Sequence, residues 1–196
     1  MTDVRTLTTA DVAAAATTLA EAFVDDPMKL FLTGGRVLPI PKAVPFFAAF
    51  LKIQMPHGLV FATSAMEAVA IWAPPGKWKV PFAKIVTNSP TFVKLYGRRL
   101  IPNLGVLGDL EKLHPSEPHY YLEFIGTAPT HQGKGMGTAL MEPMVARADA
   151  EGVGMYLESS KESNIAFYGR FGFVVREVMQ HRRNGPQQWL MWRDPK

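Results

Sequence analysis

The sequence of 196 residues contains no cysteine. This absence excludes disulfide bridges, thiol nucleophiles, iron–sulfur clusters and cysteine-ligated zinc. It is also compatible with a reducing compartment, although it does not identify one. Any group transfer that this chain catalyses must therefore proceed without an intermediate on a cysteine sulfur.

Histidine is scarce as well, and no two histidines lie three or four residues apart. They occur at His57, His114, His119, His131 and His181. Since a metal site needs three or four convergent ligands, and no helical face presents a pair of them, we expect no metal.

Long apolar runs are missing. The most apolar tract, residues 37–55, is interrupted by three prolines and two lysines, so it does not predict a membrane span. The first 22 residues contain four charged side chains and do not resemble a secretory signal. We therefore expect a cytoplasmic protein that does not associate with membranes.

The composition is that of a globular chain, with 47% hydrophobic and 19% charged residues. Its length predicts a single domain over residues 1–196. The net charge of +4 is concentrated in residues 77–112, which contain seven basic and two acidic residues. This segment fits a solvated helical surface, or one that attracts a polyanionic or acidic ligand. It carries no nucleic-acid recognition motif, and we expect no nucleic acid partner.

The order of the predicted elements indicates an α/β fold. In the first half we expect strands at 4–7, 58–63 and 68–72, and helices at 8–23 and 45–55. In the second half we expect strands at 120–127, 154–159, 173–178 and 188–192, with helices at 135–151 and 164–170. This alternation predicts a mixed sheet with helices on its faces.

The most informative segment is Ile125–Ala139, with the sequence IGTAPTHQGKGMGTA. A predicted strand leads through a loop with Gly133, Gly135 and Gly137 into a predicted amphipathic helix. Alternate glycines let a ligand approach the backbone, and the helix N-terminus supplies free N–H donors and positive potential. The segment therefore predicts a phosphate or pyrophosphate site, to which Lys134 adds a charge.

Three known glycine-loop patterns bind phosphate groups, and the sequence does not fit two of them. A Walker loop requires Ser or Thr directly after Gly-Lys, whereas Lys134 is followed by Gly135. A dinucleotide fingerprint requires G-x-G-x-x-G, whereas the spacing here is G-x-G-x-G. The third pattern, Q-x-x-G-x-G, is met by Gln132, Gly135 and Gly137. A turn that merely closes a β–α unit remains the simpler alternative.

The Q-x-x-G-x-G pattern resembles the GNAT superfamily of N-acetyltransferases. Pro129 behind the strand and the segment NIAFYGRFGF, which begins at Asn164, are similar to that family too. Residues 119–175 look most like the branch that contains puromycin N-acetyltransferases. In the first 110 residues only the order of elements and the segment Ala22–Pro27 match.

The resemblance implies a sheet of about six or seven strands, mostly antiparallel, with helices on both faces and a cofactor-binding core at about 119–175. It also implies acetyl-coenzyme A as cosubstrate, with the pantetheine along the strand and a bulge eased by Gly126. The implied cofactor-binding residues are Ile125, Gly126, Thr127, Gln132, Gly133, Lys134, Gly135, Met136, Gly137, Thr138, Asn164 and Tyr168.

Two side chains are candidates for proton transfer. Tyr168 matches the family tyrosine beside the coenzyme A sulfur, and its ordinary pKa near 10 keeps it protonated, as a general acid requires. Glu123 is the candidate general base: alternation along a strand predicts that Tyr121, Glu123 and Ile125 share one face, towards the cleft. A structural role for Glu123 beside a basic group stays open, and Glu158 is a weaker candidate base.

The sequence therefore predicts an acetyltransferase that moves the acetyl group of acetyl-coenzyme A to a primary amine of a small molecule by direct attack. A protein or peptide N-acetyltransferase and a non-catalytic acyl-coenzyme A sensor are the alternatives. His119, Tyr120 and Tyr121 are expected near the acceptor. Either a monomer or a homodimer is compatible with the sequence.

Overall fold

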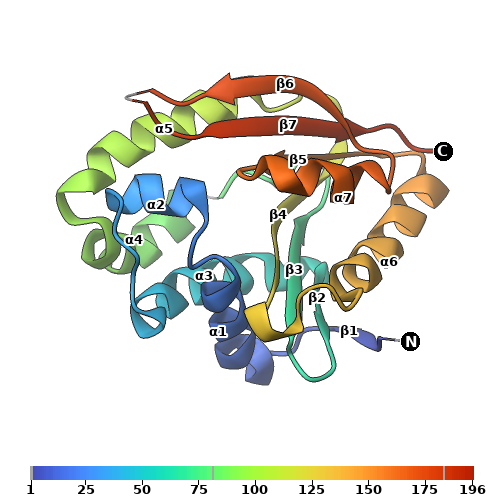
Figure 1. Cartoon of the computed structure of the whole chain (residues 1–196), viewed down its shortest axis with the longest axis horizontal. Coiled ribbons are helices and arrows are strands. Elements are labelled where there is room, and N and C mark those ends of the chain that lie inside the picture. The colour runs from blue at the N-terminus through green and yellow to red at the C-terminus, as the bar shows by residue number, and fades with distance from the viewer. Residues whose placement is uncertain (1, 81, 183) are drawn as a thin grey trace.

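One seven-stranded sheet runs through the molecule (Figure 1). The computed structural model describes residues 2–80, 82–182 and 184–196. The strands follow the order β1-β2-β3-β4-β5-β7-β6, and only β4 and β5 are parallel neighbours. Their bounds are β1 Val4–Thr6, β2 Val60–Thr63, β3 Ala68–Ala73, β4 His119–Thr127, β5 Gly154–Ser159, β6 Val174–Gln180 and β7 Gln187–Arg193. The predicted mixed, mostly antiparallel sheet is confirmed.

Helices cover both faces of this sheet. They are α1 Val12–Ala22, α2 Pro27–Thr33, α3 Ile40–Gln54, α4 Phe82–Tyr96, α5 Leu100–Leu113, α6 Met136–Glu151 and α7 Ile165–Gly169. The predicted start of α3 at Pro45 is wrong, because the helix begins at Ile40. Pro41 lies in its first turn, where no backbone N–H is needed. No helix in the described ranges is long and apolar enough to span a membrane.

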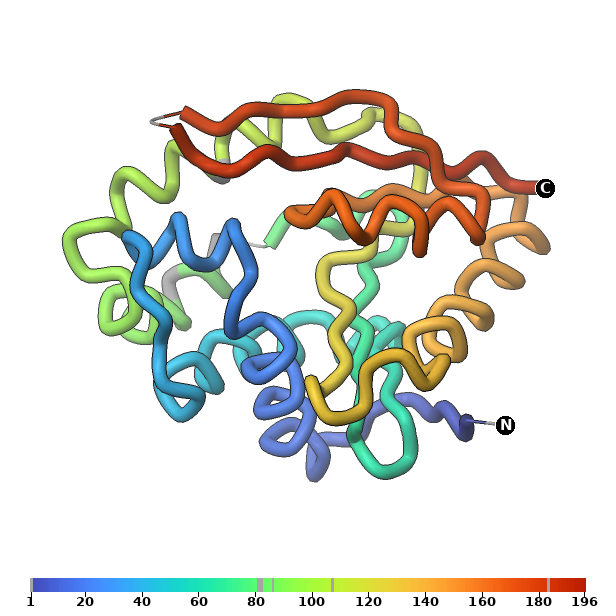
Figure 2. The backbone as a smooth tube through the Cα atoms, viewed as in Figure 1, coloured from blue at the N-terminus to red at the C-terminus, as the bar shows by residue number. Residues whose placement is uncertain are grey.

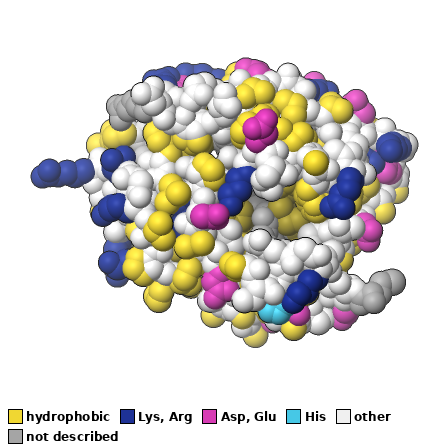
Figure 3. Space-filling model, viewed as in Figure 1, with side chains coloured by type: hydrophobic (Ala, Val, Ile, Leu, Met, Phe, Trp, Pro, Cys, Tyr) yellow, Lys and Arg dark blue, Asp and Glu magenta, His cyan; other side chains and the backbone are white. Residues whose placement is uncertain are grey.

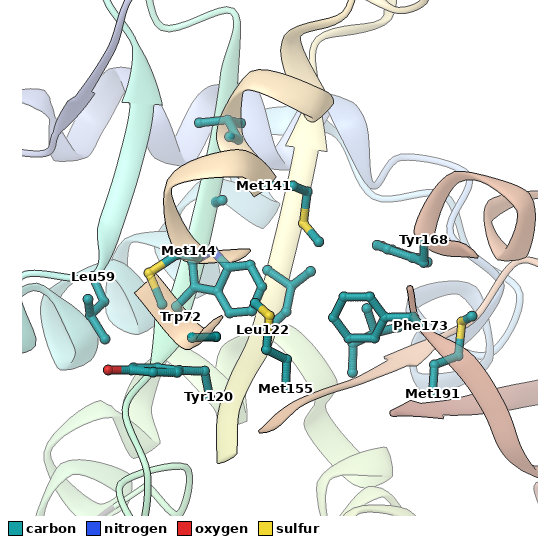
Figure 4. Packing of buried hydrophobic residues seen from close by; sticks show 14 of the residues in the cluster. Leu59, Trp72, Tyr120, Leu122, Met141, Met144, Met155, Tyr168, Phe173 and Met191 are labelled. Carbon is teal, nitrogen blue, oxygen red and sulfur yellow. The ribbon is translucent and has the colours of Figure 1, made fainter. Parts of the chain in front are cut away.

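Two buried clusters lie on opposite faces of the sheet. On one face α6 contributes Leu140, Met141 and Met144, which pack with Trp72 and Leu122 from the strands (Figure 4). On the other face α1 and α3 pack against residues of β2 and β3. Burial of these clusters holds the central strands in place, so the edges and ends of β4 and β5 become rigid supports for a site.

The two parallel strands separate part of the way along their length (Figure 2). β4 pairs with β5 from His119 to Leu122, opposite Gly154 to Leu157, while β4 itself continues to Thr127. From Glu123 onward β4 keeps only its pairing with β3. Every second residue of this stretch therefore directs backbone N–H and C=O groups into the space beside β4, where an extended ligand can bond to them.

A β-bulge in β4 lies at Glu123. Leu122 pairs with Trp72 and Phe124 pairs with Ile71, so Glu123 has no partner residue on β3. The bulge expected at Gly126 is therefore wrong in position, since the pairing there is regular. Gly126 meets a packing requirement instead: a Cβ on it would lie 2.7 Å from Cβ of Ala22. The glycine lets α1 lie directly on β4.

The bulge also reverses which face each later side chain of β4 occupies. Ile125 packs with Leu122 in the cluster beneath α6, whereas Tyr121 packs with Tyr156 in a separate cluster. Phe124 joins the cluster beneath α1 and α3. The expectation that Tyr121, Glu123 and Ile125 share one face is therefore wrong. Glu123 reaches the cleft because it lies in the bulge.

Helices α4 and α5 account for most of the basic segment 77–112. All seven of its Lys and Arg side chains are exposed, as a solvated surface requires. The inner sides of α4 and α5 contribute apolar residues to a cavity that is described below.

Candidate functional site

A cleft of about 670 Å³ opens where β4 and β5 separate. The space-filling view in Figure 3, drawn from the same side as Figure 1, shows a hollow near the middle of the molecule with basic side chains beside it. Twelve of the thirteen candidate site residues line this cleft: Glu123, Ile125, Gly126, Thr127, Gln132, Gly133, Gly135, Met136, Gly137, Thr138, Asn164 and Tyr168. These residues come from β4, the glycine loop, the start of α6 and the segment around α7, so the fold brings distant parts of the chain to one site.

The glycine loop forms a backbone cradle at the N-terminus of α6. Gly133 and Gly135 have φ values of 75° and 80°, in the left-handed region that glycine adopts without strain. A Cβ on either would meet no atom within 4 Å, so the space above the backbone is open. The first helical bond of α6 runs from Ala139 N to Gly135 O, and the preceding N–H groups point out of the helix end.

Gly137 has a different role within the same cradle. A Cβ on it would lie 3.2 Å from Cζ of Phe167, so this glycine permits α7 to pack closely on the start of α6. Phe167 itself lines the cleft. The contact holds the tyrosine-bearing helix next to the loop.

Lys134 is the one candidate that does not line the cleft. Its Nζ donates a hydrogen bond to the carbonyl oxygen of Thr130, 3.1 Å away, and the side chain is exposed. Three other basic residues, His131, Lys161 and Arg170, do line the cleft. Sequence reasoning missed Arg170, although its place two residues after Tyr168 is a usable signal.

The cleft fits a ligand that combines an extended amide arm with a pyrophosphate. The free edge of β4 offers amide-type hydrogen bonds, and the cradle offers backbone donors, positive helix potential and room for phosphate oxygens. Gln132 Nε2 donates to the carbonyl oxygen of Thr127 at 3.2 Å, which fixes the loop against the strand end. Coenzyme A has both parts, so the residues present fit it.

Tyr168 lies on the wall of the cleft, at the edge of the cluster beneath α6 (Figure 4). Its ring packs against Phe173, with centroids 6.1 Å apart, and only 7% of the residue is exposed. Burial raises the pKa of its hydroxyl, and the negative charge of Asp26 adds to that shift. The side chain therefore keeps its proton over the physiological pH range, as a proton donor must.

A second cavity of about 430 Å³ lies next to the first. Its walls come mainly from α2, α3, α4 and α5, and most of the lining side chains are apolar, both aromatic and aliphatic. Phe46 of α3 packs on Phe92 and Tyr96 of α4 as well as on Phe47 and Phe50 of its own helix, and all five side chains line this space. Of the three residues expected near the acceptor, Tyr121 lines this cavity, whereas His119 and Tyr120 are buried elsewhere.

Six residues line both cavities and so mark the junction between them: Phe23, Asp26, Glu123, Phe124, Glu158 and Ser160. Three of the six carry carboxylates. A group held in the first cavity and a group held in the second would therefore meet beside acidic side chains.

Glu123 is the most perturbed of these acids. Its Oε1 accepts a hydrogen bond of 2.6 Å from Gln54 Nε2, and its buried Oε2 has no hydrogen-bond partner among the described residues. Burial raises the pKa of Glu123 to about 8, and the charge of Glu158 adds to this while the Gln54 bond opposes it. A carboxyl that titrates near neutral pH, with one free oxygen at a junction of cavities, can accept or pass a proton.

Glu158 lies in a polar network behind the junction. Its Oε2 accepts a hydrogen bond of 2.6 Å from the hydroxyl of Tyr121, and its Oε1 lies 3.7 Å from Nδ1 of His114. His114 stacks on Trp78, with ring centroids 3.6 Å apart. These contacts fix the orientation of the Glu158 carboxylate.

Asp26 and Ser160 are junction residues that sequence reasoning did not assign to the site. Asp26 caps α2 by accepting a bond of 2.8 Å from the backbone of Lys29, and its other oxygen accepts a bond from the Ser160 hydroxyl. Lys161 and Asp25 form an ion pair beside it, at 2.8 Å. A sequence signal for Asp26 exists, because this residue lies in the segment Ala22–Pro27 that resembles the GNAT family.

Within the part of the chain that the structure describes, no three His, Asp or Glu side chains are grouped so as to hold a metal ion.

Comparison with known proteins agrees with the resemblance found in the sequence. Residues 92–173 match the sequence profile of the acetyltransferase (GNAT) family. An uncharacterised N-acetyltransferase of Schizosaccharomyces pombe is 29% identical over 94% of this chain and 80% of that protein.

Two solved structures extend this likeness to the whole fold. A histone acetyltransferase HPA2 and related acetyltransferase from Corynebacterium glutamicum has a TM-score of 0.70 and 25% identity, covering 100% of this chain and 98% of the other. A polyamine N-acetyltransferase of Drosophila melanogaster has a TM-score of 0.67 and 15% identity, covering 99% and 100%.

Proposed function

We propose that this chain is an acetyl-coenzyme A-dependent N-acetyltransferase of the GNAT family, which its similarities support, and that it transfers the acetyl group directly to a primary amine of a small molecule. The observation that carries the proposal is the meeting of two cavities at Glu123, Glu158 and Asp26. One cavity suits the acyl donor and the other suits an acceptor. The second cavity has a volume typical of sites for small ligands, which are about 300–1,000 Å³.

The first cavity holds and orients the donor. Backbone groups of β4 between Glu123 and Thr127 bond the pantetheine arm, while the cradle of Gly133 and Gly135 and the N-terminus of α6 bind the pyrophosphate. Arg170 adds a positive charge at the rim of the cleft. When bound, acetyl-coenzyme A supplies an activated acetyl group as a thioester.

The two proton-transfer residues act on opposite sides of the reaction. An acceptor that arrives as an ammonium ion first loses one proton and becomes the neutral amine. In the transfer the neutral amine nitrogen forms a bond to the thioester carbon, the carbon–sulfur bond breaks, one proton leaves the nitrogen and one reaches the sulfur. Glu123, through its free Oε2, accepts the proton from the nitrogen directly or through a water. Tyr168, which its raised pKa keeps protonated, donates the proton to the sulfur.

The finer family placement is part of the same proposal. The similarity of residues 119–175 to puromycin N-acetyltransferases supports a small-molecule acceptor, and those residues contain all twelve proposed cofactor-binding residues. A protein or peptide N-acetyltransferase is the other enzyme that this scaffold can support, and the experiment below includes both acceptor classes.

The test removes the Tyr168 hydroxyl and measures thiol release from acetyl-coenzyme A with small amines and with peptides. Tyr168→Phe keeps the ring that packs on Phe173, so we expect kcat to fall about 10²- to 10⁴-fold with little change in the Kd of coenzyme A. Tyr120→Phe is the matched control, because Tyr120 is buried outside both cavities.

The outcomes distinguish a small-molecule acetyltransferase from a peptide acetyltransferase and from a sensor, and they test the role of the Tyr168 hydroxyl. Turnover of Tyr168→Phe equal to that of the parent would remove the hydroxyl from the mechanism. Turnover with peptides alone would replace the small-molecule acceptor by a peptide. Binding of acetyl-coenzyme A by calorimetry without turnover of any amine would identify a sensor of acyl-coenzyme A instead of an enzyme.

A further inference from the structure

The acceptor cavity contains a cluster of aromatic rings centred on Phe46. Five ring centroids lie within 6.3 Å of the Phe46 centroid, and four of these pairs are edge-to-face or nearly so. The partners are Phe47, Phe50, Phe92, Tyr96 and Phe124. All six side chains line the cavity, so a bound molecule meets ring faces and edges from α3, α4 and β4. Such a wall favours an apolar body, and above all a flat ring.

Charged groups at the outer part of this cavity are already matched. Lys79 Nζ lies 3.9 Å from Oε2 of Glu111, and both side chains are exposed at the rim. Glu111 therefore presents no unmatched negative charge to a ligand at the rim. Asp26 lies at the junction, where it accepts hydrogen bonds from the Ser160 hydroxyl and from the backbone of Lys29.

The acids at the junction differ from those at the rim. Glu123 and Glu158 have no Lys or Arg partner within 4.0 Å among the described residues. One oxygen of Glu123 is buried without any hydrogen-bond partner. The cavity thus offers one place for a positive charge, at its inner end beside the donor cleft.

Lys29 adds a positive group to the same cavity. Its Nζ is buried, makes no hydrogen bond to a described residue, and lies 6.0 Å from the centroid of the Phe47 ring. Burial lowers the pKa of Lys29, and the carboxylates of Asp26 and Asp25 oppose that shift. A second ammonium placed away from the junction would meet this cation and the rings, and the carboxylate that lines the cavity there, Glu111, is already paired with Lys79.

We propose that the acceptor is an amine with a single positive charge and an aromatic body, whose ring lies among the side chains around Phe46 and whose nitrogen lies beside Glu123 and Glu158. The proposal names the substrate class for the acetyl transfer proposed above, and it rests on that function for the chemistry. It distinguishes this chain from an enzyme for diamines or polyamines, although a polyamine acetyltransferase shares its fold.

The test compares three small amines of similar length that differ in body and charge, together with a peptide. Thiol release is measured for the full chain with acetyl-coenzyme A and 2-phenylethylamine, n-hexylamine, 1,5-diaminopentane or a lysine-containing peptide. We expect kcat/KM for 2-phenylethylamine to exceed that for the diamine at least tenfold. A higher value for the diamine or for the peptide would overturn the proposal and leave the transferase itself intact.

Two substitutions connect this preference to the cavity. Phe46→Leu keeps an apolar side chain but removes the ring, so KM for 2-phenylethylamine should rise about two- to tenfold while KM for acetyl-coenzyme A stays constant. Phe61→Leu is the control, because Phe61 lines neither cavity. Lys29→Met should raise the relative kcat/KM for the diamine several-fold, whereas Lys52→Met, on the exposed side of α3, should not. Selectivity unchanged in both Phe46→Leu and Lys29→Met would overturn the proposal.

A binding measurement separates this proposal from the proposed function. If no amine supports thiol release, calorimetry of 2-phenylethylamine with the coenzyme A-loaded protein still tests the cavity. Binding that Phe46→Leu weakens and Phe61→Leu does not would support the acceptor class while the transfer reaction fails. No detectable binding of 2-phenylethylamine, together with no turnover, would overturn the acceptor class.

Discussion

The carboxyl of Glu123 makes the stability of the folded chain depend on pH. Its pKa is about 8 in the folded protein, against an ordinary value of 4.5. Between these values the folded state holds a proton that the unfolded chain has released, so the free energy of unfolding falls as pH rises from about 4.5 to about 8. This loss is the cost of keeping an ionisable group buried at the junction of the two cavities.

Glu123→Gln should remove that dependence. Glutamine keeps the shape of the side chain and can still accept the bond from Gln54, but it cannot ionise. We expect the variant to gain on the order of 3 to 4 kcal/mol relative to the parent between pH 5 and pH 8, measured by urea unfolding at each pH. Glu142→Gln, on the exposed side of α6, is the control. A constant difference between Glu123→Gln and the parent across this range would contradict the raised pKa.

The same variant distinguishes a base from a structural residue. A base must be ionised to accept a proton, so kcat/KM of the parent should rise with pH towards a midpoint near 8. In Glu123→Gln the rise of kcat/KM with a midpoint near pH 8 should disappear, and the loss of kcat/KM relative to the parent should be largest above pH 8. Parallel profiles for the parent and the variant would leave Glu123 with a structural role only.

At the scale of elements, the glycines at the two ends of α6 offer a matched pair. Gly135 caps the N-terminus with φ of 80°, Gly152 caps the C-terminus with φ of 65°, and a Cβ on either would meet no atom within 4 Å. Asparagine tolerates this backbone conformation better than other residues with a side chain. The two substitutions therefore cost similar, small amounts of stability, but only Gly135 lines the cleft.

Gly135→Asn should weaken coenzyme A binding at least tenfold, because its side chain would enter the space above the cradle where phosphate oxygens fit. Gly152→Asn should bind coenzyme A like the parent, with Kd measured by calorimetry for both. Equal affinities would show that the loop does not bind the pyrophosphate.

Local sequence signals predicted the helices and strands well, but they did not predict how these elements pair and pack. The strand–loop–helix from Ile125 to Ala139 could be predicted because glycine spacing, helix start and apolar periodicity all act within fifteen residues. The bulge at Glu123 could not be predicted, since it depends on how β4 pairs with β3.

The residues on the acceptor side of the site could not be predicted from the sequence for a related reason. Asp26 and Ser160 meet across 134 positions of the chain, and no periodicity within either segment indicates that contact. Glu123 was assigned to the cleft from a strand alternation that the bulge breaks. Long-range packing, which a single sequence does not display, decides these positions.

For the whole molecule, the cleft joins parts of the chain that are distant in sequence. Its walls include Phe23 and Asp26 from the segment between α1 and α2, Ile125 from β4, and Lys161 and Tyr168 beyond β5. Polar contacts across it include that of Asp26 with Ser160 and the ion pair of Asp25 with Lys161. An exposed pair of this kind contributes at most about 1 kcal/mol. A ligand that fills the cleft therefore adds contacts between walls that come from distant parts of the chain.

Coenzyme A should accordingly stabilise the entire chain against heat. At a free concentration of about 100 times its Kd, binding to the folded state alone adds about 2.7 kcal/mol. For a chain of this size that corresponds to a rise in Tm of about 5–10 °C by scanning calorimetry, in a single transition. Arg170→Ala should reduce the rise at a fixed ligand concentration, because Arg170 contributes charge at the rim of the cleft. A rise confined to one of two separate transitions would mean that the ligand holds only the part of the chain from β4 onward and does not join its walls.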